Sequence, residues 1–144
     1  MQVFVVGSPL ETAMALDPKR LRSQIREVHI ILAAIHGESK AWCHHPVVLM
    51  YSEPNSVRWL QMYVDILEGY LNGAMGLIQA DREARLITPE FHTTKFINQM
   101  KRRLYTKNPE HYKQWADLGE SLRNIYWSPS EKRFIEYENG KRIC

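Results

Sequence analysis

The chain has 144 residues, of which 44% are hydrophobic and 24% are charged, with a formal net charge of +3. This length suits one domain, and the hydrophobic content is enough for a core. No stretch approaches the roughly 20 apolar residues of a membrane helix, and the apolar run at residues 3–6 is too short for a signal peptide. We therefore expect a soluble, intracellular (cytoplasmic) protein.

The first elements in chain order are a short strand and a long helix. Residues 1–6 are apolar with β-branched members, which predicts a strand, and residues 10–16 could form a helical turn. Asp17 is a typical N-cap and Pro18 suits the first helical position. The helix is amphipathic and ends at Gly37. Its apolar positions are Leu21, Ile25, Val28, Leu32 and Ile35.

Further helices are predicted along the chain, followed by a β-hairpin. One begins after Pro54 and ends near Asn72, a second is less clear between residues 74 and 86, and a third follows a cap at Thr88. Another begins near residues 108–110. Residues 134–138 and 141–143 flank Asn139-Gly140, a sequence typical of a type I′ turn, and are predicted to form a β-hairpin. An isolated hairpin is marginally stable, so this one would gain stability by pairing or packing with the strand at residues 1–6. We predict a mainly α, compact single-domain fold over residues 1–129, with a hairpin extension at 130–144.

The helix at Asp17 carries a line of polar side chains beside its apolar stripe. The members are three, four and three residues apart, so they are neighbours on the helix: Asp17, Arg20, Gln24 and Glu27. Arg22, Arg26 and His29 lie on the opposite side. A carboxylate and a guanidinium at an apolar boundary suit acid/base chemistry or binding of a polar ligand. A surface ladder of salt bridges is the alternative interpretation.

A basic segment lies further along the chain. No acidic residue occurs between Glu90 and Glu110, and five basic residues do: Lys95, Lys101, Arg102, Arg103 and Lys107. Such a segment could follow the phosphates of a nucleic acid, although a solvated helix face has the same pattern. Trp127, in a Pro-flanked loop, is the tryptophan best placed to stack on a base, whereas the other three have the spacing of core residues.

No metal or cofactor site is expected. Cys43 and Cys144 are far apart in sequence and lack metal-ligand spacing, which indicates two free thiols. His44 and His45 are adjacent, so their side chains diverge. His45, before Pro46, is either a pocket residue or a hydrogen-bonded structural histidine.

Several segments, in order, resemble the pyrimidine dimer DNA glycosylase (endonuclease V-like) superfamily, in its bacterial and phage branches. The string from Leu16 to Leu21, followed by Gln24 and Glu27, is similar to its L-D-x-x-R-L-x-x-Q-x-x-E signature. Residues 42–46 resemble W-x-x-H-P, and residues 59–70 resemble the family's second long helix. Residues 107–112 resemble K-D-P-E-x-Y, and residues 126–129 resemble Y-x-W-P. The resemblance spans about residues 1–129.

The resemblance implies a mostly helical DNA repair glycosylase/AP lyase that acts on pyrimidine dimers. The chain's α-amino group near residue 2 would attack the sugar C1′, and a Schiff base and strand cleavage would follow. α-Amino groups suit this role because their pKa is ordinarily about 8. Glu27 matches the assisting glutamate. The resemblance also implies that Arg20 and Gln24 position a phosphate or base and that His45 lines the pocket. With the residues singled out from the sequence itself, the predicted substrate-binding residues are Asp17, Arg20, Gln24, Arg26, His45, Lys101, Arg102, Arg103 and Trp127.

Some residues depart from the family pattern. Gln2 is a large second residue, before which Met1 is rarely removed, so the nucleophile would be the amine of Met1 rather than that of Gln2. Residues 96–102 lack the two histidines of the family's F-H-x-S-H-R-S segment. A second hypothesis is therefore a non-catalytic nucleotide- or nucleic-acid-binding protein, perhaps phage-encoded and aimed at a host signal. A third is an interaction protein that uses an exposed Ile30.

Overall fold

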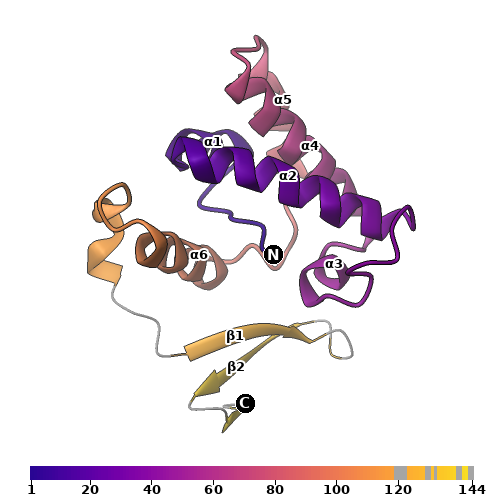
Figure 1. Cartoon of the computed structure of the whole chain (residues 1–144), viewed down its shortest axis with the longest axis vertical. Coiled ribbons are helices and arrows are strands. Elements are labelled where there is room, and N and C mark those ends of the chain that lie inside the picture. The colour runs from indigo at the N-terminus through magenta and orange to yellow at the C-terminus, as the bar shows by residue number, and fades with distance from the viewer. Residues whose placement is uncertain (119–122, 129–130, 132, 139–140, 143–144) are drawn as a thin grey trace.

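The computed structural model describes residues 1–118, 123–128, 131, 133–138 and 141–142, and side chains for residues 1–118 and 131. Within these residues the chain forms a helical body with a small antiparallel sheet beside it (Figure 1). The elements are α1 (Pro9–Ala15), α2 (Pro18–Ile35), α3 (Pro46–Met50), α4 (Pro54–Leu71), α5 (Leu77–Leu86), α6 (Thr94–Lys107), η1 (Lys113–Leu118), β1 (Arg123–Ser128), β2 (Arg133–Glu138) and β3 (Lys141–Arg142).

Helix α2 begins where the sequence predicts. The Asp17 side chain accepts a hydrogen bond from the Arg20 amide at 3.2 Å, and Pro18 occupies the first helical position. This carboxylate satisfies one of the amides that a helix start leaves without an intrahelical partner. The predicted apolar stripe is also confirmed, since Leu21, Val28 and Leu32 are buried.

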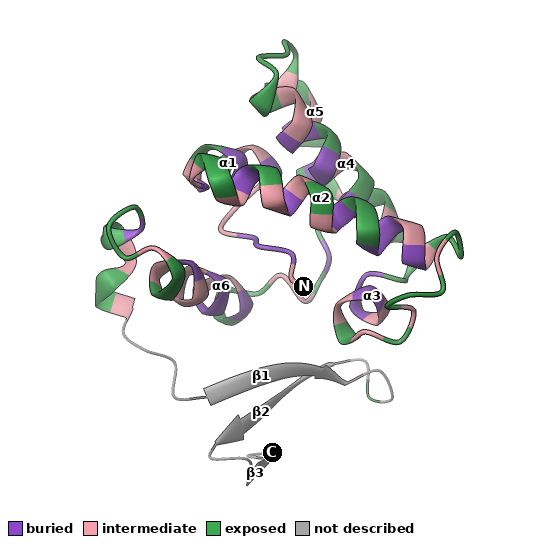
Figure 2. Cartoon of the chain, viewed as in Figure 1, coloured by how far each residue is buried: buried purple, intermediate pink, exposed green. Residues whose placement is uncertain are grey.

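Helix α4 is the central element of the helical body. It packs against α1, α2 and α5, and Trp59, Leu60 and Leu67 are among its buried side chains. Gly69 allows the close approach of α5, because a Cβ at this position would lie 2.7 Å from Leu77 Cδ2. Figure 2 shows the result: buried residues line the inner sides of α2 and α4, and exposed residues line their outer sides.

The predicted N-terminal strand is wrong. Residues 1–6 contain no strand, yet Val3, Phe4 and Val5 are at most 2% exposed. The segment runs extended through the middle of the helical body (Figure 2). Among the described residues no strand pairs with this segment, and side chains of α1, α2 and α4 form hydrogen bonds with its backbone instead. It therefore does not pair with the C-terminal strands.

The described strands form one sheet in the order β1-β2-β3. β2 and β3 pair antiparallel at Tyr137↔Arg142 and Glu138↔Lys141, where the hairpin was expected. Residues 139–140 lie outside the described residues, so the type of turn stays a prediction. β1 was not predicted: it precedes residue 129 and pairs with β2 from Arg123↔Glu138 to Ser128↔Arg133, and it contacts α3. The sheet thus extends across the expected domain boundary.

Two helix starts differ from the sequence-based expectation. The N-cap of α6 is Thr93, whose hydroxyl accepts from the Phe96 amide at 3.2 Å, whereas Thr88 lies in the preceding loop and donates to the Arg85 carbonyl. The helix expected after Pro109 is a short 3-10 helix, η1, that begins at Lys113. No helix in the described part of the chain is long and apolar enough to cross a membrane.

Candidate functional site at the N-terminus

The buried N-terminal segment is held by Gln24 of α2. The Gln24 side chain is fully buried; its Oε1 accepts from the Phe4 amide at 2.5 Å, and its Nε2 donates to the Gln2 carbonyl at 2.8 Å. A buried backbone group without a partner costs about 1–3 kcal/mol, so these two bonds offset the absence of a strand neighbour. Gln24 was expected to contact the substrate. In the structure both ends of its side-chain amide form hydrogen bonds with the backbone of residues 2 and 4.

Tyr63 of α4 holds the same segment from the other side. Its hydroxyl donates to the Phe4 carbonyl at 2.6 Å and lies 3.2 Å from Gln24 Oε1. Burial, and then the negative charge of Glu27, raise the pKa of Tyr63 well above its ordinary value. The hydroxyl therefore stays protonated and remains a donor. Glu27 lies three residues after Gln24 on α2, so the two side chains are neighbours on the same side of the helix.

The N-terminal amine lies near His45. His45 is the N-cap of α3, and its Nδ1 accepts from the Val47 amide at 3.1 Å. Burial, and then the positive charge of the amine of Met1, lower the pKa of His45. His45 is therefore neutral near pH 7, and because Nδ1 is an acceptor, its proton is assigned to Nε2. His45 thus makes the hydrogen bond of a structural histidine, and a place beside a substrate stays a prediction.

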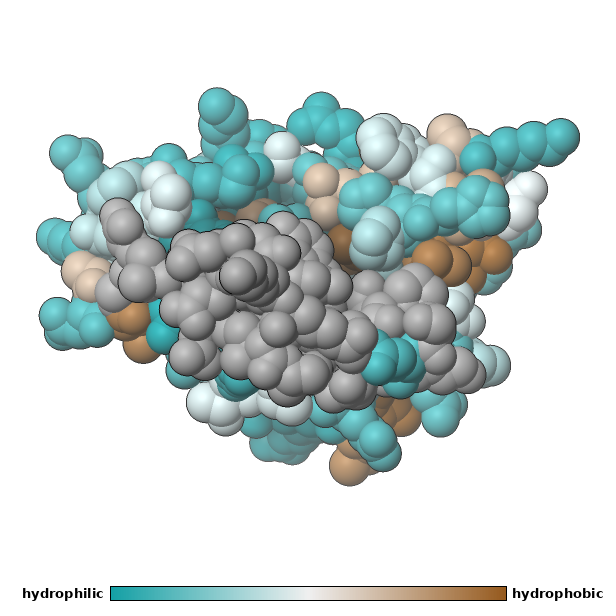
Figure 3. Space-filling model, turned by 90° about the horizontal axis from the view of Figure 1, so that it is seen from below, coloured by the Kyte–Doolittle hydropathy of each residue, from teal (hydrophilic) through white to brown (hydrophobic). Residues whose placement is uncertain are grey.

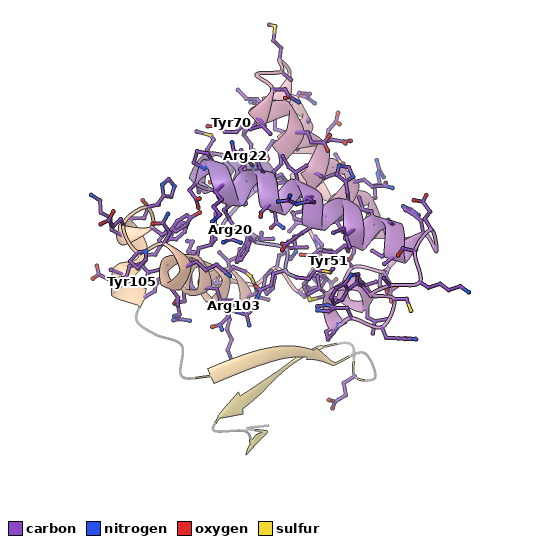
Figure 4. The ribbon with its side chains drawn as sticks, viewed as in Figure 1. Arg20, Arg22, Tyr51, Tyr70, Arg103 and Tyr105 are labelled. Carbon is purple, nitrogen blue, oxygen red and sulfur yellow. The ribbon has the colours of Figure 1, made fainter. Side chains whose placement is uncertain are left out.

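The polar line of α2 faces the N-terminal segment. The Arg20 guanidinium lies 5.9 Å from the centre of the Phe4 ring, Gln24 binds Gln2 and Phe4, and Glu27 is half-buried near Tyr63. Figure 4 shows Arg20 directed from α2 toward the interior side and Arg22 on the opposite side. The ion pairs within residues 1–118 include none between members of this line, so the salt-bridge ladder is not formed.

Asp17, the first member of the line, is occupied by structural contacts. Besides capping α2, its carboxylate accepts a hydrogen bond from the Tyr112 hydroxyl, and the Asp17 amide donates to the same hydroxyl at 3.0 Å. Burial alone would raise the pKa of Asp17, but the hydrogen bonds from Tyr112 and the Arg20 amide hold it below its ordinary value. Asp17 therefore stabilises the start of α2, and these contacts are all with the protein itself.

Two basic side chains of α6 interact with residues of the segment around η1. Lys101 Nζ lies 5.7 Å from the centre of the Trp115 ring, and Arg102 Nε donates to the Leu118 carbonyl at 3.0 Å. Arg103 is half-buried and extends from α6 toward β1 (Figure 4). Seen from the side of the sheet, the described residues around this face are mostly hydrophilic (Figure 3).

Two further expected site residues lie apart from this arrangement or outside the described side chains. Arg26 is exposed on α2, where its guanidinium lies 3.5 Å from Ser23 Oγ. Trp127 belongs to β1, opposite Phe134, but its side chain lies outside those that the structure describes. The arrangement that the structure does bring together is therefore the amine, His45, Arg20, Gln24 and Glu27.

Sequence reasoning missed Tyr63 and the role of Tyr112. Both occupy positions that resemble ordinary apolar positions of a helix, and both are at most 1% exposed. The signal that could have found them is their hydroxyl, because a buried tyrosine hydroxyl needs a hydrogen-bond partner. The partners, Phe4 and Asp17, are distant in sequence and could not be identified from spacing.

A primary amine beside a neutral imidazole, with a carboxylate nearby, has the components for covalent catalysis. An unprotonated amine can attack an electrophilic carbon, and a carboxylate can accept and return protons. Residues 1–69 match the family model described as pyrimidine dimer DNA glycosylase.

This match contains α1 to α3 and nearly all of α4, and therefore each residue of the arrangement around the amine. The segments at residues 107–112 and 126–129 lie outside it. Neither the curated proteins nor the solved structures gave a match.

Proposed function

We propose that the protein is a DNA repair glycosylase/AP lyase that acts on pyrimidine dimers or another damaged base. The observation that carries the proposal is that Gln24 of α2 and Tyr63 of α4 hold residues 2–4, and with them the N-terminal amine, on the polar side of α2, within the part of the chain that matches the pyrimidine dimer DNA glycosylase model. An amine whose neighbouring residues are buried and hydrogen-bonded is suited to reaction at a fixed position.

The proposed chemistry uses the amine of Met1, or that of Gln2 where Met1 has been removed, as the nucleophile. The amine nitrogen forms a bond to the sugar C1′ while the bond from C1′ to the base breaks, and the base leaves with a proton. Loss of a proton from nitrogen and opening of the sugar ring give the Schiff base. Removal of a C2′ proton then expels the 3′ phosphate and cleaves the strand. Glu27 is the group proposed to move these protons.

The proposed partner is damaged duplex DNA. Arg20 lies on the side of α2 that faces the N-terminal segment, and Arg103 extends from α6 toward β1 (Figure 4). Arg20 and the basic residues of α6 are proposed to bind phosphates. His45, with its Nε2 proton, is proposed to donate a hydrogen bond to the sugar or a phosphate. The resemblance to bacterial and phage members suggests a bacterial or phage source.

Borohydride trapping tests the proposal directly. The protein is incubated with a duplex that contains one abasic site, sodium borohydride is added, and the adduct is located by peptide mass spectrometry. We expect a covalent adduct at the α-amine of the mature chain, and cleavage of UV-irradiated duplex when the reductant is omitted. The proposal is contradicted if the protein gives no adduct and no cleavage at any pH between 6 and 9. Binding of DNA or nucleotides without either product, measured by calorimetry, favours the non-catalytic alternative.

A further inference from the structure

We infer that Tyr63 is a positioning residue for the N-terminal amine, and that it acts through Phe4 and Gln24. The inference rests on the proposed function, because it concerns the same amine. It adds a residue that lies on a different helix from the polar line of α2. Tyr63 itself is fully buried, so its effect must pass through the residues that it holds.

Three backbone groups at the start of the chain are fixed by only two side chains. Gln24 binds the Phe4 amide and the Gln2 carbonyl, and Tyr63 binds the Phe4 carbonyl. Only the backbone of Met1 and Gln2 lies between the last of these anchors and the reactive nitrogen. A small movement of the Phe4 peptide is therefore passed on to the amine.

The hydroxyl of Tyr63 also orients Gln24. It lies 3.2 Å from Gln24 Oε1, the same atom that accepts from the Phe4 amide. Loss of the hydroxyl leaves the Phe4 carbonyl buried without its donor and removes one neighbour of the Gln24 amide. Since a misplacement of about 1 Å can lower a rate by about 100-fold, this loss is expected to affect the chemical step more than DNA binding.

Tyr51 supplies a matched control. It is also a fully buried tyrosine with one hydroxyl partner, but that partner is His92 Nε2 at 2.7 Å and not the N-terminal segment. Burial raises the pKa of both tyrosines well above the ordinary value. The variants Y63F and Y51F thus remove the same atom from equally buried side chains, and only Y63F changes the contacts of residues 2–4.

The experiment measures single-turnover borohydride trapping on an abasic duplex, together with the Kd for the same duplex. For Y63F we expect the trapping rate to fall by about 10- to 100-fold with the Kd unchanged, and for Y51F we expect less than about a threefold change. Circular dichroism of each variant checks the fold.

Amide hydrogen exchange gives a second measurement that does not depend on DNA. Exchange of the Phe4 amide should accelerate at least about tenfold in Y63F and stay unchanged in Y51F, because only the former loosens the Phe4 peptide. Equal trapping rates for the two variants, or unaltered Phe4 exchange in Y63F, overturns the inference. If the unsubstituted protein itself gives no adduct, the proposed function is overturned, and the positioning role with it. This result differs from failure of the inference alone, in which the unsubstituted protein gives an adduct and Y63F traps as fast as Y51F.

Discussion

The hydroxyl of Tyr112 joins both the carboxylate and the amide of Asp17. It donates to Asp17 Oδ1 and accepts from the Asp17 backbone at 3.0 Å. The two residues are 95 positions apart, so this contact connects the segment after α6 to the start of α2. Burial, and then the hydrogen bond to Asp17, raise the pKa of Tyr112 above its ordinary value. The hydroxyl consequently remains a donor across the physiological pH range.

Tyr112→Phe should destabilise the protein without changing its fold. The variant loses a hydrogen bond to a charged group, for which about 1–2 kcal/mol is expected because Asp17 is only partly buried. Urea denaturation, followed by circular dichroism, measures the loss. Tyr105→Phe is the control, since Tyr105 is half-buried and no hydrogen bond of its hydroxyl appears among residues 1–118. Equal midpoints for the two variants contradict the prediction.

His92 should make stability depend on pH in mildly acidic solution. Burial lowers its pKa from 6.5 to about 3, and its ring lies among Tyr51, Trp59 and Phe96. The unfolded chain binds a proton below pH 6.5 that the folded chain does not bind until about pH 3. The free energy of unfolding should therefore decrease as the pH falls through this window, by at most about 1.4 kcal/mol per pH unit from this group.

The measurement is urea unfolding of the unsubstituted protein and of His92→Phe at pH 7.0, 5.5 and 4.5. The substitution removes the titrating group and keeps a planar ring, so the pH dependence of the variant should be shallower. Carboxylates contribute equally to both proteins and cancel in the comparison. Parallel curves show that His92 is protonated as readily in the folded as in the unfolded chain.

Glu27→Gln should separate DNA binding from the reaction. The amide keeps the size of the side chain but cannot accept a proton, and general acid/base groups contribute about 100- to 10,000-fold to rates. We expect a loss of that order in strand cleavage at an abasic site, with a Kd within about threefold of the original. Retained cleavage excludes Glu27 as the acid/base group.

Arg20 and Arg22 should differ in their effect on DNA affinity. They lie on opposite sides of α2 (Figure 4), and only Arg20 faces the N-terminal segment. One phosphate contact contributes about 0.9 to the slope of log K against log salt concentration. Arg20→Ala should reduce this slope by about one, and Arg22→Ala should leave it unchanged. Titrations by fluorescence anisotropy at several salt concentrations give both slopes, and the opposite order would place the DNA on the other side of α2.

The sequence predicted the elements whose signals are local. The cap at Asp17 and the apolar spacing of α2 were sufficient to locate that helix, and Pro54 and Asn72 gave the limits of α4. The N-terminal segment was predicted wrongly because burial and β-branched residues are shared by strands and by other extended segments. Its hydrogen-bond partners are side chains 20 and 59 positions away, which no periodicity reveals.

The sequence predicted that three polar side chains share one side of α2, but not what these side chains contact. Spacing placed Arg20, Gln24 and Glu27 on one side of α2, and the structure confirms that they share this side. Spacing could not show that Gln24 binds the protein's own backbone, because a buried amide and a ligand-binding amide occupy the same position on a helical wheel. The proximity of His45 to the amine likewise depends on the tertiary fold.

The manner in which residues 2–4 are held also determines when they can become ordered. The side chains that satisfy their backbone belong to α2 and α4, which follow them in the chain. Before α4 has packed on α2, the Phe4 carbonyl lacks the donor that Tyr63 supplies in the folded structure. Residues 2–4 are therefore held in their final position only when α2 and α4 have assembled around them.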